Sequence, residues 1–231
     1  MVRQEPKYRH ELKYLISAAQ IPILKTRIAA IMQPDAHAGA DGTYAIRSLY
    51  FDDYANRCYY ENIGGVDPRE KFRIRIYNGS SARISLECKR KERGKTLKTA
   101  CRLSEEQAQA LIAGRIPETI DHPLLQKLAL DIRMRGMRPV VIVEYDRIPY
   151  VYREGNVRVT FDTNIASSAD FAHFFDERLH RRPVMPAGQH LLEVKFDEYL
   201  PDHIYRSLNL SSLQQTAFSK YCLARKYALV K

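Results

Sequence analysis

Alternation of apolar and polar residues runs through most of the chain and predicts a fold rich in β-strands. Such alternation places successive side chains on opposite faces of an extended segment. About eight segments show it: residues 8–16, 44–53, 69–77, 82–91, 95–103, 139–153, 157–165 and 190–199. Asn78-Gly79 and Arg93-Gly94 separate the third, fourth and fifth segments, where tight turns are expected. The pattern therefore predicts consecutive antiparallel hairpins.

Helical spacing of apolar residues fills the connections between these strands. Ser17 with Gln20, and Ser104 with Gln107, are capping-box signatures of helix starts. Helices are expected at residues 17–31, 54–62, after 104, and at 122–135, 201–208 and 217–229, with a loop at 34–42. The chain shows no internal repeat and no flexible linker, so one domain over residues 1–231 is expected. The predicted fold class is α+β: an eight-stranded antiparallel β-barrel with flanking helices.

The polar faces of five strands are ionic. For a single strand, a charged face that meets water is the more common arrangement. The predicted helices, however, need apolar surface to pack against, and the opposite faces of the strands supply it. We therefore expect the ionic faces inside the barrel, where about eight strands leave room for one elongated ligand. The ionic residues are Arg9, Glu11, Lys13, Arg73, Arg75, Glu87, Lys89, Lys91, Arg158, Asp162, Glu193 and Lys195.

The charge balance indicates an anionic partner. Lys and Arg number 37 against 27 Asp and Glu, a formal net charge of +10. By itself this excess fits nucleic acid, a membrane surface or a phosphorylated small molecule. Inside a barrel, unpaired cations would be costly, and a chain of phosphates would pair with them through bidentate Arg and compact Lys contacts. The carboxylates Glu11, Glu87 and Glu193 are then either oxygen ligands of Mg²⁺ or Mn²⁺ or salt-bridge partners of the cations.

Six motifs, in order along the chain, resemble the VTC domain of the vacuolar transporter chaperone complex. They are residues 9–14 (RHELKY), 47–52 (RSLYFD), 73–75 (RIR), 86–89 (LECK), 192–195 (LEVK) and 218–221 (FSKY). The resemblance extends over about residues 8–229. The VTC domain belongs to the wider CYTH, or triphosphate tunnel metalloenzyme, superfamily. The resemblance therefore implies a tunnel barrel with basic walls.

This resemblance also implies a function and a set of site residues. The function is phosphoryl transfer from ATP that synthesises inorganic polyphosphate, dependent on Mn²⁺ or Mg²⁺, with ATP and polyphosphate or tripolyphosphate as partners. Glu193 is the best match to the metal-binding carboxylate, with Glu11 and Glu87 as further candidates. Arg73, Arg75, Lys89 and Lys220 are the implied catalytic residues. The implied phosphate-binding residues are Lys13, Arg73, Arg75, Lys89, Lys91, Arg147, Arg158, Lys195, Ser219 and Lys220, and Lys98 is a further candidate.

One departure from the superfamily pattern bears on the reaction. Hydrolytic relatives begin with Glu-x-Glu-x-Lys, whereas this chain has Arg9, Glu11 and Lys13 at the equivalent positions. Loss of the first acid favours the VTC branch and weakens Glu11 as a metal ligand. Two alternatives stay open: a triphosphatase acting on tripolyphosphate or nucleoside triphosphate, and a non-catalytic module that binds polyphosphate or nucleic acid. Cations that alternate within strands, together with carboxylates, argue against nucleic acid.

The remaining features indicate the cellular context. Cys58, Cys88, Cys101 and Cys222 show no C-x-x-C pairing and no metal-like clustering, so reduced thiols are expected. Residues 1–7 lack the apolar core of a signal peptide. We therefore expect a cytoplasmic protein, with a membrane-associated partner protein left open.

Three further features have expected structural roles. Asp52-Asp53 is expected to end a strand, Asp162 to form a salt bridge, and the basic run 180–182 to be either a solvated patch or an entrance for anions.

Overall fold

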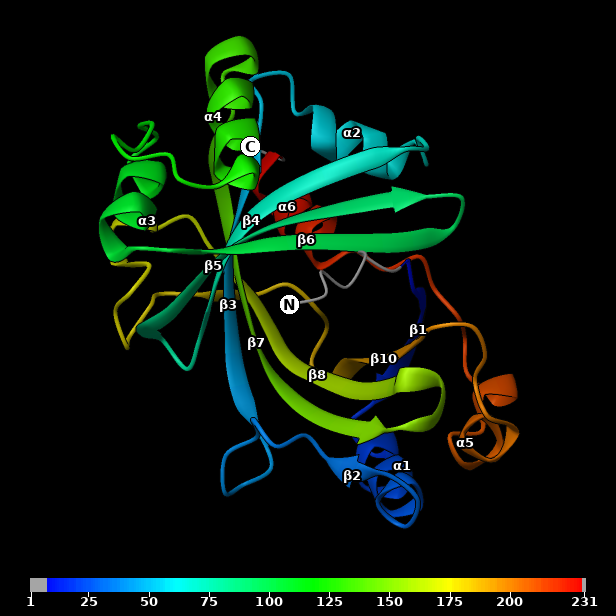
Figure 1. Ribbon diagram of the computed structural model, residues 1–231. Coiled ribbons are helices and arrows are strands. Elements are labelled where there is room, and N and C mark those ends of the chain that lie inside the picture. Colours follow the sequence, from blue (N-terminus) through cyan, green and yellow to red (C-terminus); the bar gives the residue numbers. More distant parts are fainter. Residues whose placement is uncertain (1–7, 230–231) are drawn as a thin grey trace.

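The centre of the computed structural model, which describes residues 8–229, is one curled antiparallel sheet (Figure 1). Its eight main strands are the eight predicted from the sequence. In spatial order they are β1 (His10–Ser17), β10 (Gln189–Phe196), β8 (Val157–Ser168), β7 (Arg138–Tyr152), β3 (Tyr44–Asp52), β4 (Arg69–Tyr77), β5 (Ser80–Glu92) and β6 (Lys95–Leu103). Two additional strands, β2 (Gln33–Pro34) and β9 (Arg182–Pro183), pair with β7 and β8. Two residues are too few to show alternation, and Pro34 of β2 falls in the segment predicted as a loop.

The sheet curls until its first and last strands meet. The backbone N–H groups of Arg9 and Thr96 each donate to the other residue's carbonyl oxygen at 3.0 Å. Within the described residues this is the single bridge pair that joins the two edges, so the expected barrel is joined at one point rather than along whole strands. Further along β1, Tyr14 bridges Gln215, and the N–H of Thr216 donates to the carbonyl oxygen of Lys13 at 2.9 Å. The segment before the last helix thus covers part of the exposed edge.

Helices cover the outside of the sheet, as the alternation predicts. The outward residues of β1, β8 and β10, such as Val159 and Leu192, pack with Leu24 and Ile28 of α1 (Gln20–Ala29) and with α5 (Asp202–Ser207). The outward residues of β4 and β5 pack under α3 (Glu105–Ile112) and α4 (Pro123–Arg135). Both outer clusters are apolar. The ionic alternate positions therefore face the inside of the curl, which confirms the orientation on which the sequence argument depends.

Local signals place the turns and helix starts. The hydroxyl of Ser104 accepts from the N–H of Gln107, whose side chain accepts from the N–H of Ser104, so the predicted capping box is present. The same reciprocal bonds join Ser17 and Gln20 at 2.8 and 3.3 Å. Between β4 and β5, residues 78 and 79 have φ angles of 52° and 66°, the left-handed backbone of a tight hairpin turn.

The last helix lies inside the curl rather than outside it. Tyr221, Cys222 and Ala224 of α6 (Lys220–Leu229) form a buried cluster with Val143 and Leu191 from the inner faces of β7 and β10. α2 (Arg57–Ile63) packs beside α6.

All four cysteines are free thiols, as expected. None of the helices in residues 8–229 combines the length and apolarity needed to cross a bilayer.

Candidate phosphate-binding site

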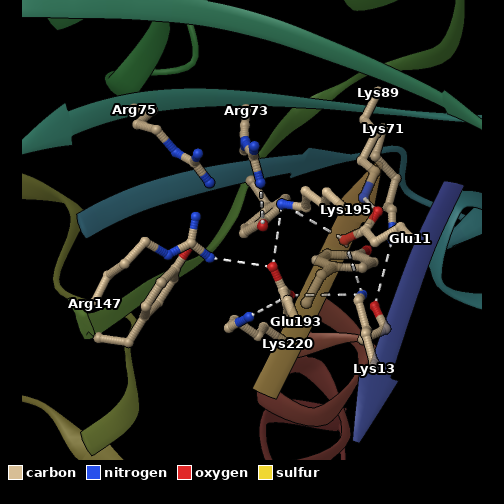
Figure 2. Close-up of a pocket in the computed structure, with 14 residues that line it drawn as sticks. Glu11, Lys13, Lys71, Arg73, Arg75, Lys89, Arg147, Glu193, Lys195 and Lys220 are labelled. Carbon is tan, nitrogen blue, oxygen red and sulfur yellow. Dashed lines mark hydrogen bonds and ion pairs between the residues drawn. The ribbon is translucent and has the colours of Figure 1, made fainter. Parts of the chain in front are cut away.

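The inner face of the curled sheet surrounds a strongly basic cavity (Figure 2). Its inner chamber, of about 70 Å³, adjoins an outer vestibule of about 730 Å³, and five residues line both. Eight cationic side chains line the chamber but only two carboxylates do. The lining residues are Glu11, Lys13, Tyr50, Lys71, Arg73, Arg75, Lys89, Tyr145, Arg147, Glu193, Lys195, Ser219, Lys220 and Tyr221. Cationic charge therefore dominates the chamber.

Glu193 of β10 is the centre of the ion-pair network. Its oxygens lie 2.8 Å from Lys220 Nζ, 3.2 Å from both Lys195 Nζ and an Arg147 nitrogen, and 3.9 Å from Lys13 Nζ. Burial opposes the charge of this carboxylate, but the surrounding cations hold the pKa of Glu193 well below its ordinary value. Glu193 therefore stays ionised at the wall of the cavity.

Glu11 of β1 is the second carboxylate at the cavity. It accepts from Lys89 Nζ at 2.5 Å, and Lys13 and Lys195 lie at 3.6 and 3.8 Å. Burial opposes its charge, yet these three lysines keep the pKa of Glu11 well below the ordinary value. Burial, together with the nearby Lys13 and Lys195, lowers the pKa of Lys89 to about 7, although Glu11 opposes the shift.

Glu87, the third carboxylate named from the sequence, is on the inner face of β5 but does not line the chamber. It is 2% exposed. Its oxygens lie 2.6 Å from Arg73 Nη2, 3.2 Å from Lys98 Nζ and 3.8 Å from Arg75 Nη1. Glu87 thus orients Arg73 and compensates part of the charge of both arginines. This arrangement matches the salt-bridge alternative left open for it.

Two cations at the cavity have few acidic partners among the described residues. Arg75 Nε donates to Ser48 Oγ at 3.2 Å, and the nearest carboxylate oxygen, of Glu87, is 3.8 Å away. Lys71 Nζ bonds Ser219 Oγ at 3.4 Å and lies 5.4 Å above the ring centre of Tyr221. Burial lowers the pKa of Lys71, as expected for a poorly compensated ammonium group. An anionic ligand would relieve this cost.

The first turn of α6 forms one side of the cavity. Ser219 precedes the helix, and its hydroxyl accepts from the N–H of Cys222 at 3.3 Å, an N-cap arrangement. Lys220 Nζ lies 2.6 Å from Asp162 and 2.8 Å from Glu193. These carboxylates raise the pKa of Lys220 although burial opposes its charge. A fixed ammonium group and a helix amino terminus therefore meet at the cavity, a combination suited to anions.

The other residues named from the sequence lie farther out. Lys91 lines the vestibule, and Lys98 is paired with Glu87. Arg158 is on the inner face of β8 but is held by Asp35 at 2.6 Å and by the Tyr44 hydroxyl at 2.7 Å, away from the chamber lining. Arg9 also turns away from the chamber, toward Asp197 at 2.9 Å.

The structure also places three further residues or segments named from the sequence. Asp162 forms salt bridges, as expected, and its partners are Arg147 and Lys220, each at 2.6 Å. Asp52 ends β3, as expected for the Asp52-Asp53 pair. In the basic run 180–182, Arg181 is paired with Glu144 at 2.5 Å outside the tunnel.

Four lining residues were missed by the sequence analysis. Lys71 lies on the same strand face as Arg73, two positions earlier, so extending the alternation would have identified it. Tyr50 and Tyr145 belong to runs in which an aromatic residue also fits a buried core position. Tyr221 reaches the cavity only because α6 lies inside the curl.

Two carboxylates at the cavity are compatible with a divalent cation that arrives with a phosphate ligand. The described residues contain no group of three or more His, Cys, Asp or Glu side chains placed to hold a metal. Mg²⁺ is commonly held by one or two carboxylates together with substrate phosphates. Glu11 and Glu193 meet that condition because both line the chamber. Glu87 does not line the chamber, and three cations engage it.

The comparisons with known proteins agree with this fold. The protein-family model for the VTC domain matches residues 8–229 of this chain. No curated protein sequence matches the chain. Among solved structures, a candidate adenylate cyclase from Bacillus halodurans aligns with a TM-score of 0.55 at 16% identity, covering 94% of this chain and 96% of that one.

Two further solved structures have the same architecture. A candidate adenylyl cyclase from Hippeastrum with a dominant triphosphatase activity gives a TM-score of 0.55 at 14% identity, covering 96% of each chain. The PH1819 protein from Pyrococcus horikoshii gives 0.50 at 13% identity, covering 95% of this chain and 99% of that one. At such identities the likeness shows the fold, which is that of the triphosphate tunnel.

Proposed function

Because this chain belongs to the VTC domain family, we propose that it is a phosphotransferase that uses ATP to extend inorganic polyphosphate inside the tunnel. The observation that carries this proposal is the excess of cations in the chamber, eight against two carboxylates. Such an excess within a buried cavity needs an anion, and a linear triphosphate offers many oxygens along a narrow path. Tripolyphosphate would bind in the same way.

The two kinds of cation have separate roles. Arg73, Arg75 and Arg147 present planar guanidinium groups in the chamber, suited to bidentate contact with phosphate oxygens. Lys89 and Lys220 supply point charges from opposite walls, and Lys220 is oriented by Asp162 and Glu193. Phosphoryl transfer depends mainly on positioning and on stabilising charge at the moving group. These groups provide both without a covalent intermediate on the protein.

The divalent metal would be held by Glu11 and Glu193. Mn²⁺ or Mg²⁺ bound there would supply further neutralisation of phosphate charge. Both carboxylates are ionised and lie among lysines that phosphate oxygens would recruit, so ligand binding would free them for a metal. Glu87 takes no part in this site, since its role is to hold Arg73.

The vestibule favours a polyanionic acceptor over water alone. Its walls include Arg69, Lys71, Lys89 and Lys91, so the basic surface continues from the chamber to the opening. A growing phosphate chain would find cations along this route, whereas a water molecule needs none of them. The chamber, of about 70 Å³, is also far too small to hold a nucleic acid duplex, which supports a single phosphate chain as the ligand.

Incubation of the protein with Mn²⁺ and ATP tests the proposal. We expect a ladder of polyphosphate on a gel, with ADP formed in equal amount to the phosphate incorporated. ADP accompanied only by free phosphate would assign hydrolysis, the activity of the Hippeastrum structure, to the same site. Tight tripolyphosphate binding without turnover would leave a binding module. An Arg75→Ala variant serves as the inactive control, because Arg75 lines the chamber and is weakly paired.

A further inference from the structure

Asp52 lies outside the phosphate site but is tied to it. This carboxylate ends β3, is fully buried, and is not among the residues that line the chamber. It accepts from the backbone N–H groups of Asp53 at 2.9 Å, Cys58 at 2.8 Å and Tyr59 at 3.2 Å. Two of these donors belong to the first turn of α2, so Asp52 fixes the start of that helix to the end of β3.

The fourth donor to Asp52 comes from α6. The Tyr221 hydroxyl donates a hydrogen bond to Oδ2 of this carboxylate. The ring of Tyr221 lines the chamber, lies 5.2 Å from the Tyr50 ring, and is under the ammonium group of Lys71. Tyr221 thus has its hydroxyl in the scaffold and its ring in the phosphate site.

Lys220 precedes Tyr221 in the same helical turn. Two further contacts attach α6 to α2: Arg225 donates to the Asn56 side chain, and Cys222 Sγ lies 3.0 Å from Asn62 Oδ1. The bond between Tyr221 and Asp52 connects this pair of helices to the sheet at the level of the chamber. A shift of α6 would move Lys220 away from Asp162 and Glu193, its partners across the site.

We propose that Asp52 and Tyr221 form a positioning pair for phosphate binding. The pair sets the location of Lys220 and of the Tyr221 ring on which Lys71 lies. The hydrogen bond of the pair, whose acceptor Asp52 does not line the chamber, acts through the lysines and not by contact with phosphate. The rival interpretation is that the bond only satisfies a buried carboxylate and so stabilises the fold. The two interpretations differ in one measurable respect. If the pair positions Lys220, the effect of losing the Tyr221 hydroxyl on tripolyphosphate affinity depends on the presence of Lys220; if the bond only stabilises the fold, it does not.

A double-mutant cycle makes that measurement. Tripolyphosphate affinity is determined by calorimetry for wild type, Tyr221→Phe, Lys220→Ala and the double variant. Tyr221→Phe keeps the ring, and Asp52→Asn, which keeps the shape of the carboxylate, is the second variant. We expect Tyr221→Phe to weaken binding about tenfold in the wild-type background, equivalent to about 1.4 kcal/mol. In the Lys220→Ala background we expect about threefold or less, because coupled residues are not additive.

The control is Tyr150→Phe, which removes the hydroxyl of a tyrosine in the outer cluster around α1. It should leave the dissociation constant within about twofold of wild type. Equal factors for Tyr221→Phe in both backgrounds, or unchanged binding in Tyr221→Phe and Asp52→Asn, would overturn the positioning role. The inference rests on the proposed function: a wild-type protein that fails to bind tripolyphosphate overturns both, whereas a binding wild type with an additive cycle overturns only this one.

Discussion

The two faces of the same strands make opposite contributions to the free energy of folding. On β5, Leu86 points outward and is fully buried under helices, whereas Glu87, the next residue, points inward among guanidinium groups. On β8, Val159 and Phe161 are in the outer apolar cluster, and Asp162 pairs with Arg147 inside. The outer face gains free energy from burial of apolar area. The inner face loses free energy by desolvating charges and recovers it in part through ion pairs.

Because of this difference, the outer face contributes mainly to the stability of the fold, and the inner face contributes mainly to ligand binding. The lowered pKa values of Lys71, Lys89 and Lys195, each due first to burial, show that the free protein holds positive charge at a cost. A ligand with several negative charges removes that cost when it binds. Changes to the outer face should therefore alter the free energy of unfolding, and changes to the inner face should alter ligand affinity.

The largest effect is expected from Leu86→Ala on the outer face. Leu86 is fully buried between β5 and the covering helices, so its truncation leaves a cavity. We expect the free energy of unfolding to fall by about 2–5 kcal/mol, measured by urea denaturation. Tripolyphosphate affinity of the folded variant should stay within about twofold of wild type. A large loss of affinity with unchanged stability would mean that the two faces are not independent.

A somewhat smaller effect is expected from Glu193→Gln on the inner face. Loss of this carboxylate leaves Lys220, Arg147 and Lys195 with one counter-ion fewer. We expect the free energy of unfolding to fall by about 3 kcal/mol in the absence of ligand. Tripolyphosphate without metal should then raise the melting temperature of the variant more than that of wild type. Glu118→Gln, an exposed carboxylate outside the tunnel, is the control and should match wild type in both respects.

The smallest effect is a pH dependence from Lys89. Its pKa of about 7 in the folded protein is below the value of about 10.4 in an unfolded chain, so the unfolded chain binds more protons between these values. Stability should therefore rise with pH across that window. Affinity should change in the opposite direction, because phosphate needs the charged ammonium group.

We expect tripolyphosphate affinity of wild type, relative to Lys89→Met, to fall about threefold to tenfold between pH 6.5 and 8.5. The ratio to the variant removes the titration of the phosphate itself, which both proteins share. Calorimetry at several pH values provides the measurement. Parallel pH profiles for the two proteins would show that Lys89 keeps its charge throughout and does not titrate at the site.

Much of the fold could be predicted from the sequence because its signals are local. Alternation identified all eight main strands, and capping residues such as Ser104 identified helix starts. The inward direction of the ionic faces followed from the need of helices for apolar surface. The partial closure of the sheet could not be predicted, since the meeting of Arg9 and Thr96 depends on the curl of the whole sheet.

The site could be predicted only in part, for a related reason. Strand periodicity indicates which residues face inward but not which of them reach the ligand. Arg158 and Glu87 share the inner face with Glu193, yet their partners Asp35 and Arg73 hold them away from the chamber. The contribution of Tyr221 depends on α6 lying inside the curl, a long-range packing result.

The most direct test compares two arginines on opposite sides of the wall. Arg75 lines the chamber, whereas Arg115 is exposed outside it, so Arg75→Ala and Arg115→Ala remove the same charge from the whole protein. Calorimetric titration with tripolyphosphate should show about thirtyfold or greater loss of affinity for Arg75→Ala, the cost of a charge-assisted contact of about 2 kcal/mol. Arg115→Ala should stay within about twofold of wild type. Equal losses in the two variants would show that the ligand responds to net charge and not to the tunnel.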